Sequence, residues 1–291
     1  MRPRDIGNVS VAPVLEAEGP LLEAAMVFPD WNPDAVKDDP WPLAPQFYDA
    51  ERSLLVIAIQ SFLLKTRRHT ILIDACIGND KERNNPAFSR LRLPWIETLA
   101  RAGARPEDID IVLCTHMHVD HVGWNTRLEN GRWVPTFPNA RYLFAKREWE
   151  HWERVQRENG LTRTGDYIGD SVLPVMEAGK ADLVATDHEI EPGIWLDHMP
   201  GHTPGQVAVH VKSGRDEAIF TGDMMHHPVQ CARPDWSTNF CTDKTQAAET
   251  RRKFLDRYAD ANVLVVPSHF PGATSGHVVR GKGRGYGFRF D

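Results

Sequence analysis

The chain has 291 residues, of which 41% are hydrophobic and 25% are charged, and both fractions are ordinary for a globular protein in water. A formal net charge of −6 at pH 7 argues against a nucleic-acid partner, because nucleic-acid-binding surfaces carry a basic footprint. No apolar run suits a signal peptide or a membrane span, and the four cysteines lack zinc-knuckle spacing, so we expect reduced thiols, a cytoplasmic location and no membrane partner.

Residues 1–50 are rich in proline and predict an irregular segment that follows one strand at 9–15. Trp31 and Trp41 stand there among Asp and Pro, whereas a disordered tail would be poorer in aromatic residues. We therefore expect an ordered arm or lid packed on a single domain formed by residues 51–291. The arm could border the active site or a partner subunit in a homodimer.

Residues 51–291 alternate between short apolar runs and amphipathic segments. The runs 54–64 and 70–73 predict a strand hairpin turned at 66–69. The later pattern predicts, in chain order, a helix at 94–102, strands at 109–113 and 141–145, helices at 146–158 and 165–179, strands at 183–186, 194–198, 206–212 and 217–221, a helix at 243–260 and a strand at 262–266. Groups of strands followed by a helix occur in each half, which predicts two sheets packed face to face with helices outside.

A histidine-rich motif follows the strand predicted at 109–113 and contains His116, His118, Asp120 and His121. Side chains alternate along a strand, so His116 and His118 would point to the same side. A turn into a helix would then bring Asp120 and His121 near the same point. Imidazole nitrogen and carboxylate oxygen suit zinc and other borderline transition metals, so the motif predicts a metal site.

Three further candidate ligands stand at the ends of later predicted strands: His202, Asp223 and His269. Small or turn-forming residues flank each of them, which lets the backbone come close to a metal. With the first motif they make seven nitrogen and carboxylate ligands, enough for two metal ions.

The chain resembles the metallo-β-lactamase superfamily in elements that occur in the family's order. These are Asp74 after its strand, His116-x-His118-x-Asp120-His121, Pro200-Gly201-His202-Thr203-Pro204-Gly205, Thr221-Gly222-Asp223 and Ser268-His269. The resemblance implies an α/β (α+β) fold, a four-layer αββα sandwich, with a dinuclear metal site on one edge.

The resemblance also implies roles for the ligands. His116, His118 and His202 would bind one metal, Asp120, His121 and His269 the other, and Asp223 would bridge them, while Asp74 would orient a ligand histidine from behind. We expect two divalent metal ions, zinc first, with manganese, iron and cobalt as alternatives. A hydroxide bridging the metals would attack the ester carbonyl, and Asp120, Asp223 or His226 could relay a proton to the leaving group.

Within the superfamily, the layout is most similar to N-acyl-homoserine lactonases and methyl parathion hydrolase. In those proteins an insertion between the first motif and the third histidine, here 122–198, shapes the pocket. The chain departs from the lactonases at His226, because they place a substrate-orienting tyrosine three residues after the bridging aspartate. A histidine can still donate a hydrogen bond to a carbonyl. Trp124, Met224 and Phe270 are the predicted pocket residues.

These observations predict a metal-dependent hydrolase of small esters, most simply a lactonase of the quorum-quenching type. Phosphotriesterase, thioesterase and β-lactamase activities are alternatives within the enzyme class. A scaffold that holds metal or ligand without turnover is the alternative from another class.

Overall fold

The computed structural model describes residues 1–38, 40–161, 164–281 and 285–291 and contains two compact units. Unit 1 consists of Met1, Ala17–Ala58 and Glu189–Asp291, and unit 2 consists of Arg2–Glu16 and Ile59–His188. Two long strands, β2 (Val9–Glu23) and β4 (Leu54–Lys65), have residues in both units. The predicted arm boundary at residue 50 and the insertion at 122–198 stay predictions. The insertion includes 162–163, which lie outside the described residues.

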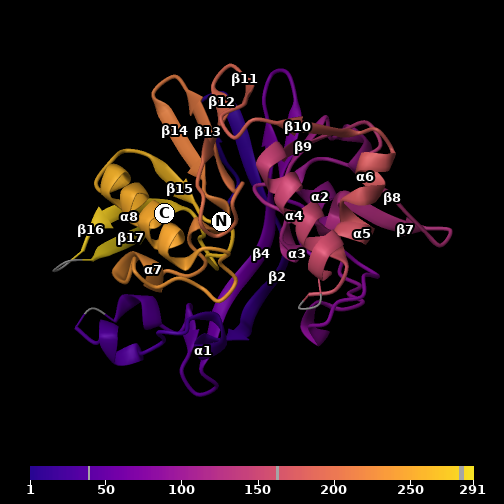
Figure 1. Cartoon of the computed structure of the whole chain (residues 1–291). Helices are drawn as coiled ribbons and strands as arrows, with labels where there is room; N and C mark the ends of the chain where they lie inside the picture. Colours follow the sequence, from indigo (N-terminus) through magenta and orange to yellow (C-terminus); the bar gives the residue numbers. More distant parts are fainter. Residues whose placement is uncertain (39, 162–163, 282–284) are drawn as a thin grey trace. The chain divides into compact units, whose positions relative to one another are not determined.

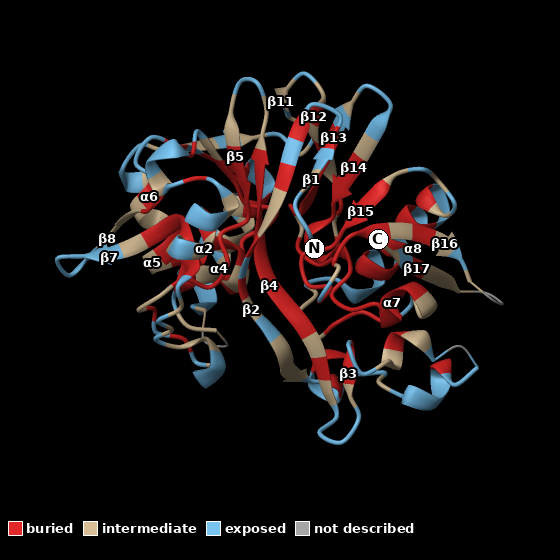
Figure 2. Cartoon of the chain, turned by 180° about the vertical axis from the view of Figure 1, so that it is seen from behind, coloured by how far each residue is buried: buried red, intermediate tan, exposed pale blue. Residues whose placement is uncertain are grey.

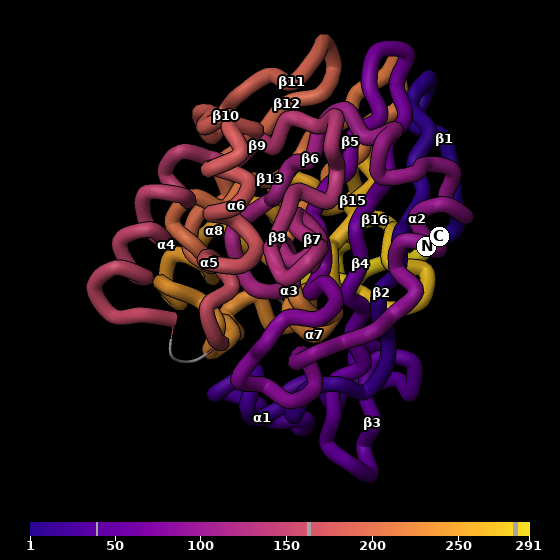
Figure 3. The backbone as a smooth tube through the Cα atoms, turned by 90° about the vertical axis from the view of Figure 1, so that its right-hand side faces the viewer, coloured from indigo at the N-terminus to yellow at the C-terminus, as the bar shows by residue number. Residues whose placement is uncertain are grey.

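Unit 2 is built on one mixed sheet (Figure 3). Its strand order is β1 (Arg4–Ile6), β2, β4, β5 (Thr70–Ile73), β6 (Ile111–Leu113), β9 (Arg141–Ala145) and β10 (Ala181–Val184). β4 and β5 form the predicted antiparallel hairpin, whereas β5, β6, β9 and β10 pair in parallel. The apolar residues of β5 and β6 are almost wholly buried, as expected for strands covered on both faces. Because β5 and β6 are parallel, the segments after Ile73 and Leu113 leave the sheet at the same edge.

The helices of unit 2 are α2 (Trp95–Ala102), α3 (Val119–Val122), α4 (Lys146–Asn159), α5 (Tyr167–Ser171) and α6 (Leu173–Glu177). Figure 1 shows α4 beside β9 and β10. α2 ends at residue 102 as predicted, and Gly103, which follows it, has a left-handed conformation. The single helix predicted at 165–179 is wrong. The chain forms two short helices there, and Pro174, which lacks a backbone N–H, stands in the first turn of the second.

A hairpin of β7 (Thr126–Glu129) and β8 (Arg132–Pro135) was not predicted. Asn130 and Gly131 form its turn with φ of 51° and 76°. An Asn-Gly pair between strands is a strong hairpin signal, so the sequence contained the information.

Unit 1 is built on a second sheet, and the long helix α8 (Lys244–Tyr258) packs against it. The strand order is β11 (Glu189–Glu191), β12 (Ile194–His198), β13 (Val207–Ser213), β14 (Asp216–Phe220), β15 (Leu264–Val266), β16 (Gly276–Arg280) and β17 (Tyr286–Phe290). The Asp243 side chain accepts the N–H of Gln246 at 2.9 Å, which confirms the predicted start of α8. β16 and β17 were not predicted.

Residues 17–58 complete unit 1 with α1 (Ala24–Val27), β3 (Tyr48–Asp49) and the first residues of β4, 54–58; α7 (Val229–Ala232) lies in the same unit. Phe28 and Trp31 pack on Trp236, with ring centroids 6.1 and 5.8 Å apart, so this segment has an apolar core with the later chain. Figure 2 shows that β4 is buried along most of its length. Within the described ranges, every helix is too short or too polar to cross a bilayer.

Candidate metal centre

The histidine motif of unit 2 forms a tight loop between β6 and α3. His118 is extended, with φ −90° and ψ 163°, and α3 begins at the next residue, as the spacing predicted. The ring centroid of His116 lies 4.7 Å from that of His118 and 4.1 Å from that of His121. Asp120 Oδ1 is 3.8 Å from His121 Nε2. The structure therefore brings these four side chains together.

Asp74 lies behind this loop and is fully buried. His121 Nδ1 donates to Asp74 Oδ2 at 2.9 Å, and the Thr115 N–H donates to Oδ1 at 2.7 Å. An imidazole that donates from Nδ1 keeps its lone pair on Nε2, which is the form that binds a metal. The geometry suits the orienting role predicted for Asp74.

Sequence reasoning missed two buried carboxylates of unit 2, Glu148 and Glu16. Glu16 accepts the N–H groups of Ile77 and Gly78 and the Nε1–H of Trp124, at 2.8, 3.1 and 2.7 Å. Burial raises the pKa of Glu16 to about 7, although these hydrogen bonds oppose the shift. The sequence does place Glu16 among the apolar residues of β2, and an acidic residue in such a run indicates a buried carboxylate with hydrogen-bond partners.

The ligand candidates of unit 1 converge on Asp223, which lies in a 3-10 turn, Gly222–Met224, directly after β14. The Nε2 atoms of three imidazoles lie close to its carboxylate oxygens, at 3.0 Å for His269, 3.1 Å for His226 and 3.3 Å for His202. Asp223 is 3% exposed, so the cluster is screened from water.

The protonation of this cluster tests whether it suits a metal. His269 Nδ1 donates to the carbonyl of Ala58 at 2.7 Å, so a neutral His269 has its lone pair on Nε2. That lone pair faces a carboxylate oxygen, which is also only an acceptor. Two acceptors 3.0 Å apart need a proton or a cation between them. Nitrogen and carboxylate donors in this arrangement fit a divalent cation of the zinc class.

Glycine holds the His202 turn against α8. Gly201 has φ of 130°, and a Cβ there would lie 2.2 Å from the backbone nitrogen of Ala247. The N–H groups of Thr242 and Asp243 donate to the carbonyls of His202 and Gly201 at 2.8 and 2.9 Å. Only glycine allows this close approach with a positive φ.

His226 belongs to the same cluster, as its ring centroid lies 4.7 Å from that of His202 and 5.6 Å from that of His269. Burial lowers its pKa despite the neighbouring Asp223 carboxylate. Its backbone N–H donates to Gln230 Oε1 at 2.7 Å, which fixes the turn. Within the described part of the chain, His226 Nδ1 has no hydrogen-bond partner. His226 can therefore hold or release a proton beside Asp223.

The predicted pocket residues Trp124, Met224 and Phe270 are all buried. Trp124 stacks on Trp95 at 5.2 Å, and Phe270 packs edge-on against Phe288 at 5.1 Å. Their role in a substrate pocket stays a prediction, and burial leaves little of these side chains to a ligand. Phe240 is partly exposed, and its ring lies 6.2 Å from His226.

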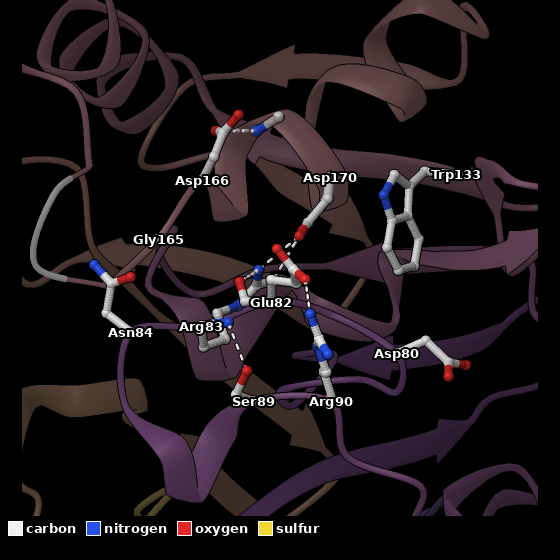
Figure 4. A pocket seen from close by; sticks show the side chains of 11 residues that line it. Asp80, Glu82, Arg83, Asn84, Ser89, Arg90, Trp133, Gly165, Asp166 and Asp170 are labelled. Atoms are coloured by element: carbon white, nitrogen blue, oxygen red, sulfur yellow. Dashed lines mark hydrogen bonds and ion pairs between the residues drawn. The ribbon is translucent and has the colours of Figure 1, made fainter.

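Unit 2 also contains a polar pocket of about 860 Å³ (Figure 4). Its central contact is the fork between Arg83 and Asp170, with N–O distances of 2.6 and 2.8 Å. Trp133 forms one wall, and no described histidine or cysteine lines the pocket. The side chains that line this pocket therefore differ in kind from those of the histidine clusters.

Residues 55–281 match the profile of the metallo-β-lactamase superfamily. An N-acyl homoserine lactonase of Bacillus sp. is 25% identical over 179 residues, which cover 57% of this chain and 63% of that protein. The lactonase AiiB of Agrobacterium fabrum is 27% identical over 192 residues, with 58% and 63% covered. The chain thus spans less than two thirds of the length of these curated relatives.

Two solved structures are similar over nearly the whole chain. The hydrolase AbOPH, of the beta lactamase superfamily, has a TM-score of 0.81 at 24% identity and covers 98% of this chain and 95% of its own. The dizinc quorum-quenching lactonase AidC has a TM-score of 0.80 at 21% identity and covers 100% and 97%. These likenesses confirm the predicted fold.

Proposed function

Because the chain belongs to the metallo-β-lactamase superfamily, we propose that it is a metal-dependent hydrolase of small esters, most simply a lactonase. The observation that carries the proposal is the buried Asp223 carboxylate with three imidazole nitrogens within 3.3 Å. His269 Nε2 and the Asp223 carboxylate are both acceptors, and burying them 3.0 Å apart without a proton or a cation between them would cost free energy, because each has lost its water without gaining a donor.

The ligands are assigned as the sequence suggested. His116, His118 and His202 would hold one divalent cation, Asp120, His121 and His269 the other, and Asp223 would contact both. Each side chain offers one imidazole nitrogen or carboxylate oxygen. Zinc suits this donor set best, with manganese, iron and cobalt as alternatives.

Divalent cations held by these residues would supply a lowered pKa for a bound water and polarisation of the ester carbonyl. The protein's own groups do the rest. Asp74 fixes the His121 ring through the 2.9 Å hydrogen bond. His226 would take up the proton that the attacking water loses and give it to the leaving alkoxide, and Asp120 or Asp223 could serve instead.

The lactone substrate is proposed from the relatives. Several are named N-acyl homoserine lactonases, and a solved structure with a TM-score of 0.60 at 18% identity has N-hexanoyl-L-homoserine bound at the catalytic metal centre. A quorum-quenching role and a cytoplasmic location belong to the same proposal. All four cysteines are free in the structure, which agrees with a reducing compartment.

The test is hydrolysis by the purified protein of N-acyl homoserine lactones, phosphotriesters, thioesters and β-lactams, with elemental analysis of the same samples. We expect two metal ions per chain, lactone turnover, and loss of turnover on chelation. His226→Phe should lower kcat about 100-fold with metal content unchanged, because a positioned acid contributes that much. Two bound metals without turnover of any ester would favour the scaffold instead.

A further inference from the structure

Glu148, in the first turn of α4, is 1% exposed and reaches the backbone of the histidine loop. Its Oε1 accepts the N–H of Met117 at 2.9 Å. Met117 stands between His116 and His118, so this hydrogen bond fixes the peptide that joins the two histidines. Sequence periodicity predicted a helix at 146–158 and gave Glu148 no role.

Trp152 joins the same arrangement one helical turn later. Its Nε1–H donates to the same Glu148 oxygen at 2.6 Å. Its ring stands edge-on to His118, with centroids 5.1 Å apart and planes at 65°. Residues four apart lie on one face of a helix, so Glu148 and Trp152 contact the histidine loop from the same face of α4.

The two contacts constrain different degrees of freedom. The Glu148 hydrogen bond holds the backbone between His116 and His118, and the indole limits the rotation of the His118 ring. A buried carboxylate that accepts two N–H groups is also hard to replace, because its loss leaves both donors unsatisfied. Packing of α4 alone would need neither the shared oxygen nor the ring contact to His118.

We propose that Glu148 and Trp152 are positioning residues that hold His116 and His118 in the geometry required for metal binding. The inference rests on the proposed function in taking these two histidines as ligands. Groups behind metal ligands commonly change metal affinity or activity by 10- to 100-fold when they are mutated.

The test compares Trp152→Leu, which removes the ring, with Trp152→Phe, which keeps a ring but loses the N–H. Glu148→Gln keeps an acceptor oxygen but loses the charge. Trp149→Leu and Glu150→Gln are matched controls from the same helix. Among the described residues, Trp149 makes no hydrogen bond or ring contact with the histidine loop. Glu150 is exposed.

Each variant is titrated with zinc against a competing chelator and loaded with cobalt for its visible absorption spectrum; its melting temperature is measured without metal. We expect Trp152→Leu to weaken binding of one metal about 10- to 100-fold and to change the cobalt spectrum. Trp152→Phe and Glu148→Gln should have smaller effects in the same direction, and the controls none.

A merely structural role would lower the melting temperature and leave the affinity and the spectrum of folded protein unchanged. That result in Trp152→Phe and Glu148→Gln would overturn the inference even if Trp152→Leu fails to fold. Wild-type protein that binds two metals but hydrolyses no ester would overturn only the proposed function. Wild-type protein that binds no metal would overturn both.

Discussion

The two ligand-bearing regions reach similar chemistry by different means. In unit 2 the candidate ligands come from one short loop, 116–121, and Asp74 supports it from behind through His121 and Thr115. In unit 1 the ligands come from three turns far apart in the sequence, at His202, Asp223 and His269. Their supports are a backbone carbonyl, that of Ala58, and close backbone packing at Gly201.

The two regions therefore differ in what the surrounding protein must do for the ligand side chains. A contiguous motif sets its own spacing, so its supporting groups only need to hold the loop backbone and orient the rings. Three distant turns depend on the strands and the helix that hold them. We therefore expect changes in unit 2 to act on metal affinity and changes in the turns of unit 1 to act on folding as well.

Asp223→Ala should have the largest effect, because it removes a carboxylate that contacts three imidazoles. Metal content and turnover should fall together, with kcat/KM at least about 1,000-fold lower, since bound metals supply several kcal/mol of charge stabilisation. Asp197→Ala is the matched control, because Asp197 pairs with His210 at 3.3 Å elsewhere in unit 1. Normal turnover in Asp223→Ala would exclude the bridging role.

Asp74→Ala should act on affinity. Without its carboxylate, His121 loses the acceptor that fixes its ring, so we expect metal binding about 10- to 100-fold weaker. Asp80→Ala is the control, because Asp80 also has positive φ, 63° against 61° for Asp74. Chelator competition measures both variants. Equal affinity would place Asp74 outside the metal centre.

Gly201→Ala should act on folding first. The added Cβ would lie 2.2 Å from the Ala247 nitrogen at a φ of 130°, so we expect a loss of about 3 kcal/mol in unfolding free energy. Gly214→Ala is the control, because its φ is also positive, at 66°, but nothing lies within 4 Å of its Cβ. Urea unfolding of both variants measures the difference. Equal losses would mean that the close approach to α8 costs nothing.

Sequence predicted what depends on local chemistry. The motif 116–121 shows its geometry through strand alternation, and Asp243 marks the start of α8. The buried roles of Glu148 and Glu16 were not predicted, because their hydrogen-bond partners Met117, Ile77 and Trp124 lie far away in the sequence. Such pairs depend on tertiary structure, and no spacing rule indicates them.

An effect on pH dependence is expected for His227, which ties the Asp223 turn to residues 17–58 of unit 1. Its Nε2 donates to the carbonyl of Phe47 at 2.8 Å, and its Nδ1 accepts the N–H of Val229 at 3.2 Å. Both nitrogens are thus occupied in the neutral form, and a proton on Nδ1 would face another N–H. Burial lowers the pKa of His227 from 6.5 to about 4.

The sign of the pH effect follows from this shift. Between pH 6.5 and about 4, His227 binds a proton in the unfolded chain but not in the folded chain. Its contribution therefore lowers the free energy of unfolding as the pH falls. Between pH 7 and pH 5 the loss should be about 2 kcal/mol. His227→Gln can offer a similar donor and acceptor but does not titrate. The stability advantage of wild type over this variant, measured by urea unfolding of metal-free protein, should therefore shrink by that amount on acidification. An advantage that stays constant would mean that His227 is protonated in the folded protein as readily as in the unfolded chain, which the two hydrogen bonds oppose.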